Sequence, residues 1–147
     1  MSDARNKGFT LIELVVSVCI VALLLTLTLP SYQKQLRSTR RSLGSAELQE
    51  VLMRQEQYFL DRKRYANTLT ALGFPASPYS IDAQGNALSA LTADSIYLIE
   101  LSLQQDAYTV HAIPQFGQAA DSVCGMLSID SMGTKRAAGG AAVRECW

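Results

Sequence analysis

The residues with the clearest chemical meaning lie near the start of the chain, where a short polar segment meets a long apolar run. Residues 7–13 read KGFTLIE across this junction, and Glu13 is the only charged side chain between residues 9 and 29. As a helix, that run would be about 30 Å long, which is the thickness of the hydrocarbon core of a bilayer. A carboxylate in such a helix costs roughly 2–3 kcal/mol on membrane insertion, so Glu13 is a functional candidate that requires a cation.

The order of segments at this junction differs from that of a secretory signal peptide. In a signal peptide the apolar region comes first and the cleavage site follows it. Here the Gly8-Phe9 bond precedes the apolar run. Cleavage at this bond would remove residues 1–8 and leave a protein that begins with an apolar helix and stays in the membrane.

The junction resembles the class III signal of the type IV pilins, with a basic leader that ends in Gly8, followed by Phe9 and Glu13. The resemblance implies that a prepilin peptidase cleaves after Gly8 and that the new amino group of Phe9 is N-methylated. It also implies that the Phe9 amine and Glu13 neutralise each other between subunits and set the axial register of a filament. Two simpler interpretations stay open: a plain N-terminal anchor, and a glutamate that favours the N-terminal end of the helix dipole.

The composition fits one further domain after the anchor. The chain has 147 residues with 13 basic and 13 acidic side chains. Residues 30–147 carry 11 of each sign, because Arg5 and Lys7 drop out of the basic count and Asp3 and Glu13 out of the acidic count. Roughly 118 residues are enough for one hydrophobic core. A domain without net charge is not expected to bind nucleic acid strongly through bulk charge alone.

No motif predicts an enzyme, a metal site or a cofactor. The sequence has no H-E-x-x-H, P-loop or G-x-S-x-G pattern. His111 is the single histidine and lies in a strand-like segment, so we expect it to be structural. Zinc is disfavoured because no Cys-x-x-Cys occurs. Calcium is disfavoured because Asp82, Asn86 and Asp94 lack the spacing of a calcium loop and are better explained as turn residues.

The three cysteines fall into two environments. Cys19 lies in the apolar run, where we expect a small buried hydrophobe. Cys124 and Cys146 can pair if their domain lies outside the cytoplasm, and closing this loop would stabilise the fold by roughly 3 kcal/mol. Their spacing resembles the disulfide-bounded C-terminal region of type IV pilins. Type II secretion pseudopilins, which share the N-terminal junction, generally lack that disulfide.

The helical pattern continues beyond the anchor. Apolar residues spaced three and four apart indicate a helix from residue 31 to about residue 65. Pro30 is expected to kink or locally open the helix, and by resemblance residues 22–29 form a hinge that extends when subunits pack into a filament. The chain therefore divides into a leader (residues 1–8), a transmembrane and filament-core helix (residues 9–29) and a globular domain (residues 30–147).

The second half of the chain predicts an antiparallel sheet. Alternating segments indicate strands at residues 96–103 and 108–114 joined by a hairpin, and a third strand at residues 124–130. Residues 66–95 are expected to form a connecting loop with a short strand at residues 79–81. We therefore expect an α+β fold in which the long helix packs on three or four antiparallel strands, with a loop-rich C-terminal region closed by a disulfide.

Two groups of basic residues are candidates for contacts with binding partners. The first follows the anchor and is expected to form a solvated face or to contact lipid headgroups or neighbouring subunits, with a DNA-facing patch as the alternative: Lys34, Arg37, Arg40 and Arg41. A positive-inside count would place this group in the cytoplasm, whereas the resemblance of the leader places it in the periplasm. The second group consists of candidates for contacts with duplex DNA: Lys135, Arg136 and Arg144, together with Arg62, Lys63 and Arg64.

The soluble part resembles PilE-like minor pilins of type IVa systems, which are related to the ComP minor pilins that receive DNA. This resemblance is carried by RQEQYF at residues 54–59 and by residues 108–130 with the terminal ECW. It implies a minor pilus subunit that primes assembly and thereby supports motility, adhesion or competence, with a DNA receptor or a pseudopilin as alternatives. The implied partners are other pilins, the peptidase and N-methylase, an inner-membrane assembly platform and lipid. The protein would span the inner membrane once before assembly and lie in the fibre afterwards.

Overall fold

The computed structural model describes residues 9–147, except for the side chains of residues 27–30. The leader, and with it Gly8 of the predicted cleavage site, lies outside the described residues, as does the side chain of Pro30. The chain divides into two compact units, residues 1–36 and residues 37–147. Helix α1, Leu11–Arg62, forms most of the described part of the first unit and is the first element of the second.

The first turn of α1 is capped by Thr10. The backbone N–H of Glu13 donates to Thr10 Oγ1 at 3.3 Å, so Thr10 caps the helix in the T-x-x-E arrangement. The following helical segment has the length and composition to cross a membrane. Its backbone is helical through residues 22–30, so the hinge stays a prediction about the assembled state. Cys19 is exposed rather than buried, because none of the residues that the structure describes covers the apolar run.

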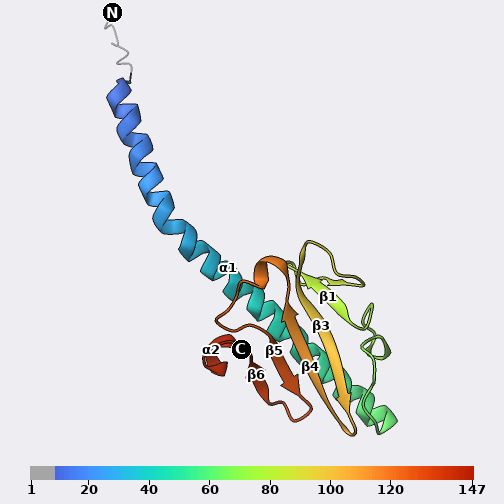
Figure 1. Ribbon diagram of the computed structural model, residues 1–147. Coiled ribbons are helices and arrows are strands. Elements are labelled where there is room, and N and C mark those ends of the chain that lie inside the picture. Colours follow the sequence, from blue (N-terminus) through green and yellow to red (C-terminus); the bar gives the residue numbers. More distant parts are fainter. Residues whose placement is uncertain (1–8) are drawn as a thin grey trace, which may run out of the picture. The chain divides into compact units, whose positions relative to one another are not determined.

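The second unit contains one sheet of six antiparallel strands in the order β2-β1-β3-β4-β5-β6. Figure 1 shows the part of α1 that belongs to the second unit lying along one face of this sheet. The strands, followed by the short helices, have these bounds: β1 Tyr79–Asp82, β2 Ala87–Leu88, β3 Ser95–Gln104, β4 Ala107–Pro114, β5 Leu127–Asp130, β6 Lys135–Ala137, η1 Thr70–Leu72, η2 Phe116–Gln118 and α2 Val143–Cys146.

The α+β fold is confirmed, but the expected three or four strands were too few. The two missed strands, β2 and β6, have two and three residues, which is too short for an alternating pattern to show in the sequence. Strand β5 begins at Leu127 rather than at Cys124, because Gly125 adopts a left-handed conformation with φ 60° that interrupts an extended strand. Helix α1 ends at Arg62, three residues before the expected end, since Lys63 turns to φ 56°.

The core lies between α1 and the sheet. Leu48 and Val51 of α1 are fully buried with inward residues of the strands, which include Tyr97, Ile99 and Val110. Gly44 makes the close approach of helix and sheet feasible. A Cβ atom at this position would lie 2.9 Å from the Tyr97 ring, closer than normal contact allows.

Candidate functional sites

The predicted assembly residues are both exposed in the first unit. Phe9 is 84% exposed, and Glu13 is exposed in the first turn of α1. Within residues 9–147, the Glu13 carboxylate takes part in no ion pair. The large apolar side chains from Leu11 to Leu25 are exposed as well. The geometry therefore leaves an apolar helix and a carboxylate for an external partner to cover.

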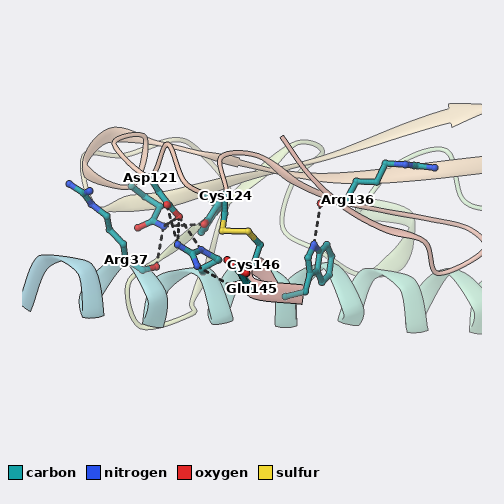
Figure 2. The surroundings of a disulfide bond; sticks show 10 residues. Arg37, Asp121, Cys124, Arg136, Glu145 and Cys146 are labelled. Carbon is teal, nitrogen blue, oxygen red and sulfur yellow. Dashed lines mark hydrogen bonds and ion pairs between the residues drawn. A yellow bond between two sulfur atoms is a disulfide. The ribbon is translucent and has the colours of Figure 1, made fainter. Parts of the chain in front are cut away.

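The predicted disulfide is formed in the second unit. Cys124 and Cys146 are bonded, with 5.6 Å between their Cα atoms, and both are buried. Figure 2 shows the polar contacts beside this bond. Arg41 of α1 donates from Nε and Nη2 to the two carboxylate oxygens of Asp121, at 3.0 and 3.1 Å, and from Nη1 to the backbone carbonyl of Glu145 at 3.3 Å. The C-terminal region is thus attached to α1 by an ion pair as well as closed by a disulfide.

The basic group that follows the anchor does not form one solvated face. Arg41 is largely buried in its ion pair with Asp121, and the backbone carbonyl of Arg37 accepts from Gln118 Nε2 at 3.3 Å. Arg40 lines a polar cavity of about 320 Å³ together with Asp82 and other residues. The sequence prediction was therefore wrong for Arg41, because a basic residue can lie on the buried face of a helix when a carboxylate reaches it.

The DNA candidates of the C-terminal region lie on two neighbouring elements, β6 and α2. Lys135 Nζ lies 4.9 Å from the centre of the Trp147 ring, and Trp147 Nε1 donates to the backbone carbonyl of Arg136 at 3.1 Å. Arg144 is exposed on α2. Lys135 and Trp147 are therefore in contact, and Arg144 is exposed on the neighbouring helix; these three residues are here called the C-terminal basic surface.

Arg136 differs from Lys135 in its direction and its partner. Consecutive residues of a strand point to opposite faces of the sheet. Arg136 is in register with Ser128 on the face away from the core, whereas Lys135 is opposite the buried Ile129. Arg136 Nη2 lies 3.1 Å from Asp130 Oδ2. The prediction that Arg136 joins the other two cations is therefore only partly met, since an acidic neighbour offsets its charge.

The remaining basic candidates lie at the C-terminal end of α1. Arg62, Lys63 and Arg64 are all exposed, and Lys63 and Arg64 line a cleft of about 590 Å³. The other lining residues come from the end of β3, with Leu103, and from the turn between β3 and β4, with Gln105 and Asp106. Sequence reasoning found the cations but missed the cleft, because its two walls are about forty residues apart in the chain.

The other polar residues have structural explanations. Asp82 accepts from the backbone N–H of Gln84 and of Asn86, at 2.9 and 2.8 Å, which is the turn arrangement expected for it. The hydrogen bond from the Asn86 side chain is the main cause that lowers the pKa of Asp82. Among the described residues no cluster of three or more metal-ligating side chains occurs. His111 is half-buried on β4, opposite Glu100 and Ser128.

Comparison with known families gives two matches that together span most of the chain. Residues 30–128 match the family described as "Type IV minor pilin ComP, DNA uptake sequence receptor". Residues 3–29 match the family described as "Prokaryotic N-terminal methylation motif". The first match ends before Lys135, Arg136 and Arg144, whereas the cleft at the end of α1 lies wholly within it.

Individual proteins are similar over parts of their length. The type IV major pilin protein PilA of Myxococcus xanthus is 30% identical over 92 residues, which are 63% of this chain and 41% of PilA. The type IV wide pilus major component PilA4 of Thermus thermophilus is 31% identical over 81 residues, which are 52% of this chain and 62% of PilA4. The chain thus spans less than two thirds of either relative.

A solved structure of a type IV pilin from Shewanella oneidensis shares the fold. It has a TM-score of 0.50 at 18% identity, and the match covers 76% of this chain and 97% of that one.

Proposed function

The chain belongs to the ComP family of type IV pilins, and we propose that it is a minor subunit of a type IV pilus. The observation that carries this proposal is the family match over residues 30–128, joined to a methylation motif over residues 3–29. The two similar PilA proteins are described as major components. The minor role is therefore the part of the proposal that needs a direct test.

The N-terminal junction supports a processing step before assembly. We expect a prepilin peptidase to cleave between Gly8 and Phe9 and an N-methylase to modify the Phe9 amine. The domain after the anchor would face the periplasm, where the oxidising environment permits the Cys124–Cys146 disulfide. Mass spectrometry of the purified protein tests the processing, because it detects both the loss of residues 1–8 and a methyl group on Phe9. An unmodified N-terminus in a strain that makes pili would contradict this step.

The exposed carboxylate and apolar helix support assembly through subunit contacts. In an apolar filament core, Glu13 and the Phe9 amine of a neighbouring subunit would neutralise each other in a low dielectric, where an unpaired charge is costly. The partners would be major and minor pilins and the inner-membrane assembly platform. We expect Glu13→Gln to reduce the amount of this chain in sheared pili, while its amount in the membrane stays unchanged.

A matched control lies one helical turn away. Ser17 is exposed, and its hydroxyl donates to the backbone carbonyl of Glu13 at 2.7 Å. Ser17→Ala therefore changes a polar group about 6 Å further along the same helix without removing a charge, and we expect normal incorporation. Equal incorporation of Glu13→Gln and Ser17→Ala would refute the charge pairing.

The minor role is tested by abundance and by deletion. A minor subunit forms a small fraction of sheared pilus protein, yet its deletion lowers the number of pili or abolishes them when it primes assembly. Quantitative mass spectrometry of sheared fibres and pilus counts in a deletion strain measure the two properties. A chain that makes up the bulk of the fibre would be a major pilin and would overturn this part of the proposal.

Binding of duplex DNA is a second function, favoured by the family description and by the C-terminal basic surface. Lys135 and Arg144 would contact phosphates, which position DNA without reading its sequence. Each phosphate contact contributes about 0.9 to the slope of log affinity against log salt for duplex DNA. We expect Lys135→Gln with Arg144→Gln to weaken binding of the full chain, held in neutral detergent micelles, and to reduce this slope by about 2. An unchanged affinity and slope would refute the assignment.

A further inference from the structure

The cleft at the end of α1 combines aromatic rings with positive charge. Its volume of about 590 Å³ lies within the range of roughly 300–1,000 Å³ that is usual for ligand sites. Its lining includes three half-buried aromatic side chains, two exposed cations, two side-chain amides and one carboxylate. These residues are Tyr58, Phe59, Tyr65, Lys63, Arg64, Asn67, Gln105 and Asp106.

The aromatic rings are held in place by contacts with one another. The ring centres of Phe59 and Tyr65 are 4.8 Å apart, and those of Tyr65 and Tyr108 are 4.7 Å apart. Arg62 lies over Tyr58, with its guanidinium carbon 5.6 Å from the ring centre. The ring contacts restrict the orientation of Phe59 and Tyr65 before any ligand arrives, which reduces the entropy lost on binding.

The two walls of the cleft also carry unusual backbone conformations. Lys63 has φ 56° and Gln105 has φ 53°, and Phe116 is the one other non-glycine residue with a positive φ in the described part of the chain. Gln105 occupies the first loop position of the two-residue hairpin between β3 and β4, where a positive φ favours glycine. Such conformations are unfavourable by about 1–3 kcal/mol and tend to lie at ligand sites.

We propose that this cleft binds unpaired nucleotides of a DNA strand. Bases would stack on Tyr58 and Tyr65, because every base has a flat π-face and such stacking tolerates any sequence. Phosphates would contact Lys63 and Arg64, which are both exposed in the lining of the cleft. The inference rests on the proposed binding of DNA and adds a second site to it. A frayed end or single-stranded extension would occupy the cleft while the C-terminal basic surface contacts duplex.

Three DNA probes separate the cleft from the C-terminal basic surface. They are a blunt duplex, the same duplex with a single-stranded thymidine extension, and the duplex with an extension that has sugar and phosphate but no bases. Binding of each to the full chain in neutral detergent micelles is measured by fluorescence anisotropy. We expect the thymidine extension to strengthen binding by about 5- to 150-fold for each stacked base. The extension without bases should give little of this gain.

Two variants of the cleft and one matched control complete the test. Tyr58→Leu removes one of the two π-faces but keeps apolar volume, and it should reduce the gain from the bases without changing binding of the blunt duplex. Lys63→Gln with Arg64→Gln changes only exposed side chains and should reduce the salt slope for the extended probe by about 0.7 for each lost phosphate contact. Lys135→Gln with Arg144→Gln is the control, which should weaken binding of the blunt duplex and leave the gain from the extension unchanged. Thermal denaturation checks that each variant is folded.

The outcomes separate failure of this inference from failure of the proposed DNA binding. Binding of blunt duplex without any gain from the extension overturns the cleft assignment and leaves the duplex proposal intact. Binding of the extended probe without binding of the blunt duplex overturns the duplex proposal and supports the cleft. Stacking is overturned if the gain in affinity is unchanged in Tyr58→Leu and the extension without bases gives the same gain. It is also overturned if a neutral oligosaccharide displaces the extension, which would assign the cleft to sugar.

Discussion

The ion pair between Arg41 and Asp121 gives the sharpest prediction about stability. The side chains of Arg41 and Asp121 are 14% and 2% exposed, and two hydrogen bonds of 3.0 and 3.1 Å join them. Removing one partner of a buried pair leaves an unpaired charge and costs about 3–5 kcal/mol. We therefore expect Asp121→Ala to lower the free energy of unfolding by about that amount. At about 4 °C per kcal/mol for a domain of this size, the midpoint of thermal unfolding would fall by about 12–20 °C.

The chain offers a matched control on the same helix. Arg54 and Glu50 form a salt bridge at 2.6 Å, but their side chains are 37% and 45% exposed. Exposed pairs are worth about 0.2–1 kcal/mol, so we expect Glu50→Ala to cost less than about 1 kcal/mol. The two variants are compared by circular dichroism during thermal and urea unfolding of the full chain in neutral detergent micelles.

A double variant tests the reason for the loss. Replacing a buried ion pair by apolar residues is often neutral or stabilising, because no charge is left without a partner. Arg41→Met combined with Asp121→Leu should therefore recover most of the stability lost in Asp121→Ala, with a coupling energy of at least about 2 kcal/mol. If Asp121→Ala costs no more than Glu50→Ala, or if the double variant is as unstable as the single one, the buried ion pair does not stabilise this fold as we argue.

Three further predictions concern the core, the disulfide and pH. Gly44→Ala should lower stability by up to about 2 kcal/mol in urea unfolding, because overpacking against Tyr97 outweighs the gain in helix propensity; a more stable variant would contradict this. Reducing the disulfide should cost about 3 kcal/mol, and an equal unfolding midpoint with and without reductant would contradict it. Burial raises the pKa of Glu47, which accepts a hydrogen bond from the Tyr79 hydroxyl, so its protonation stabilises the fold. Stability should therefore fall as pH rises above 4.5 and less so in Glu47→Gln; a pH-independent difference between the two proteins would contradict the assignment.

The features predicted best from sequence are those that depend on neighbouring residues. The long apolar helix and the hairpin between β3 and β4 both follow from composition or alternation over a few residues. The short strands β2 and β6 depend instead on a longer neighbouring strand that offers free backbone groups. Pairing of β6 with β5 therefore decides its structure, and its own residues, Lys-Arg-Ala, contain no strand signal.

The candidate sites were less predictable because they combine distant segments. Arg64 and Asp106 face one cleft, but no spacing in the sequence relates the end of α1 to a hairpin turn. Likewise Lys135 and Arg136 are adjacent in sequence, yet the alternation of β6 sends them to opposite faces. Counting basic residues locates the charge, whereas strand register and helix termination decide which charges act together.

The basic group after the anchor shows that some of this information was available in the helical period. Positions 41, 44, 48, 51 and 55 follow three- and four-residue steps, and all of them except Arg41 are buried in the core or against it. Arg41 therefore continues the buried stripe of α1 toward the anchor. A cation on such a stripe requires a carboxylate from another element, and Asp121 supplies it. If the buried face of α1 had been identified before the basic residues were grouped, Arg41 would have been separated from its three basic neighbours. A structural ion pair would then have been predicted for it.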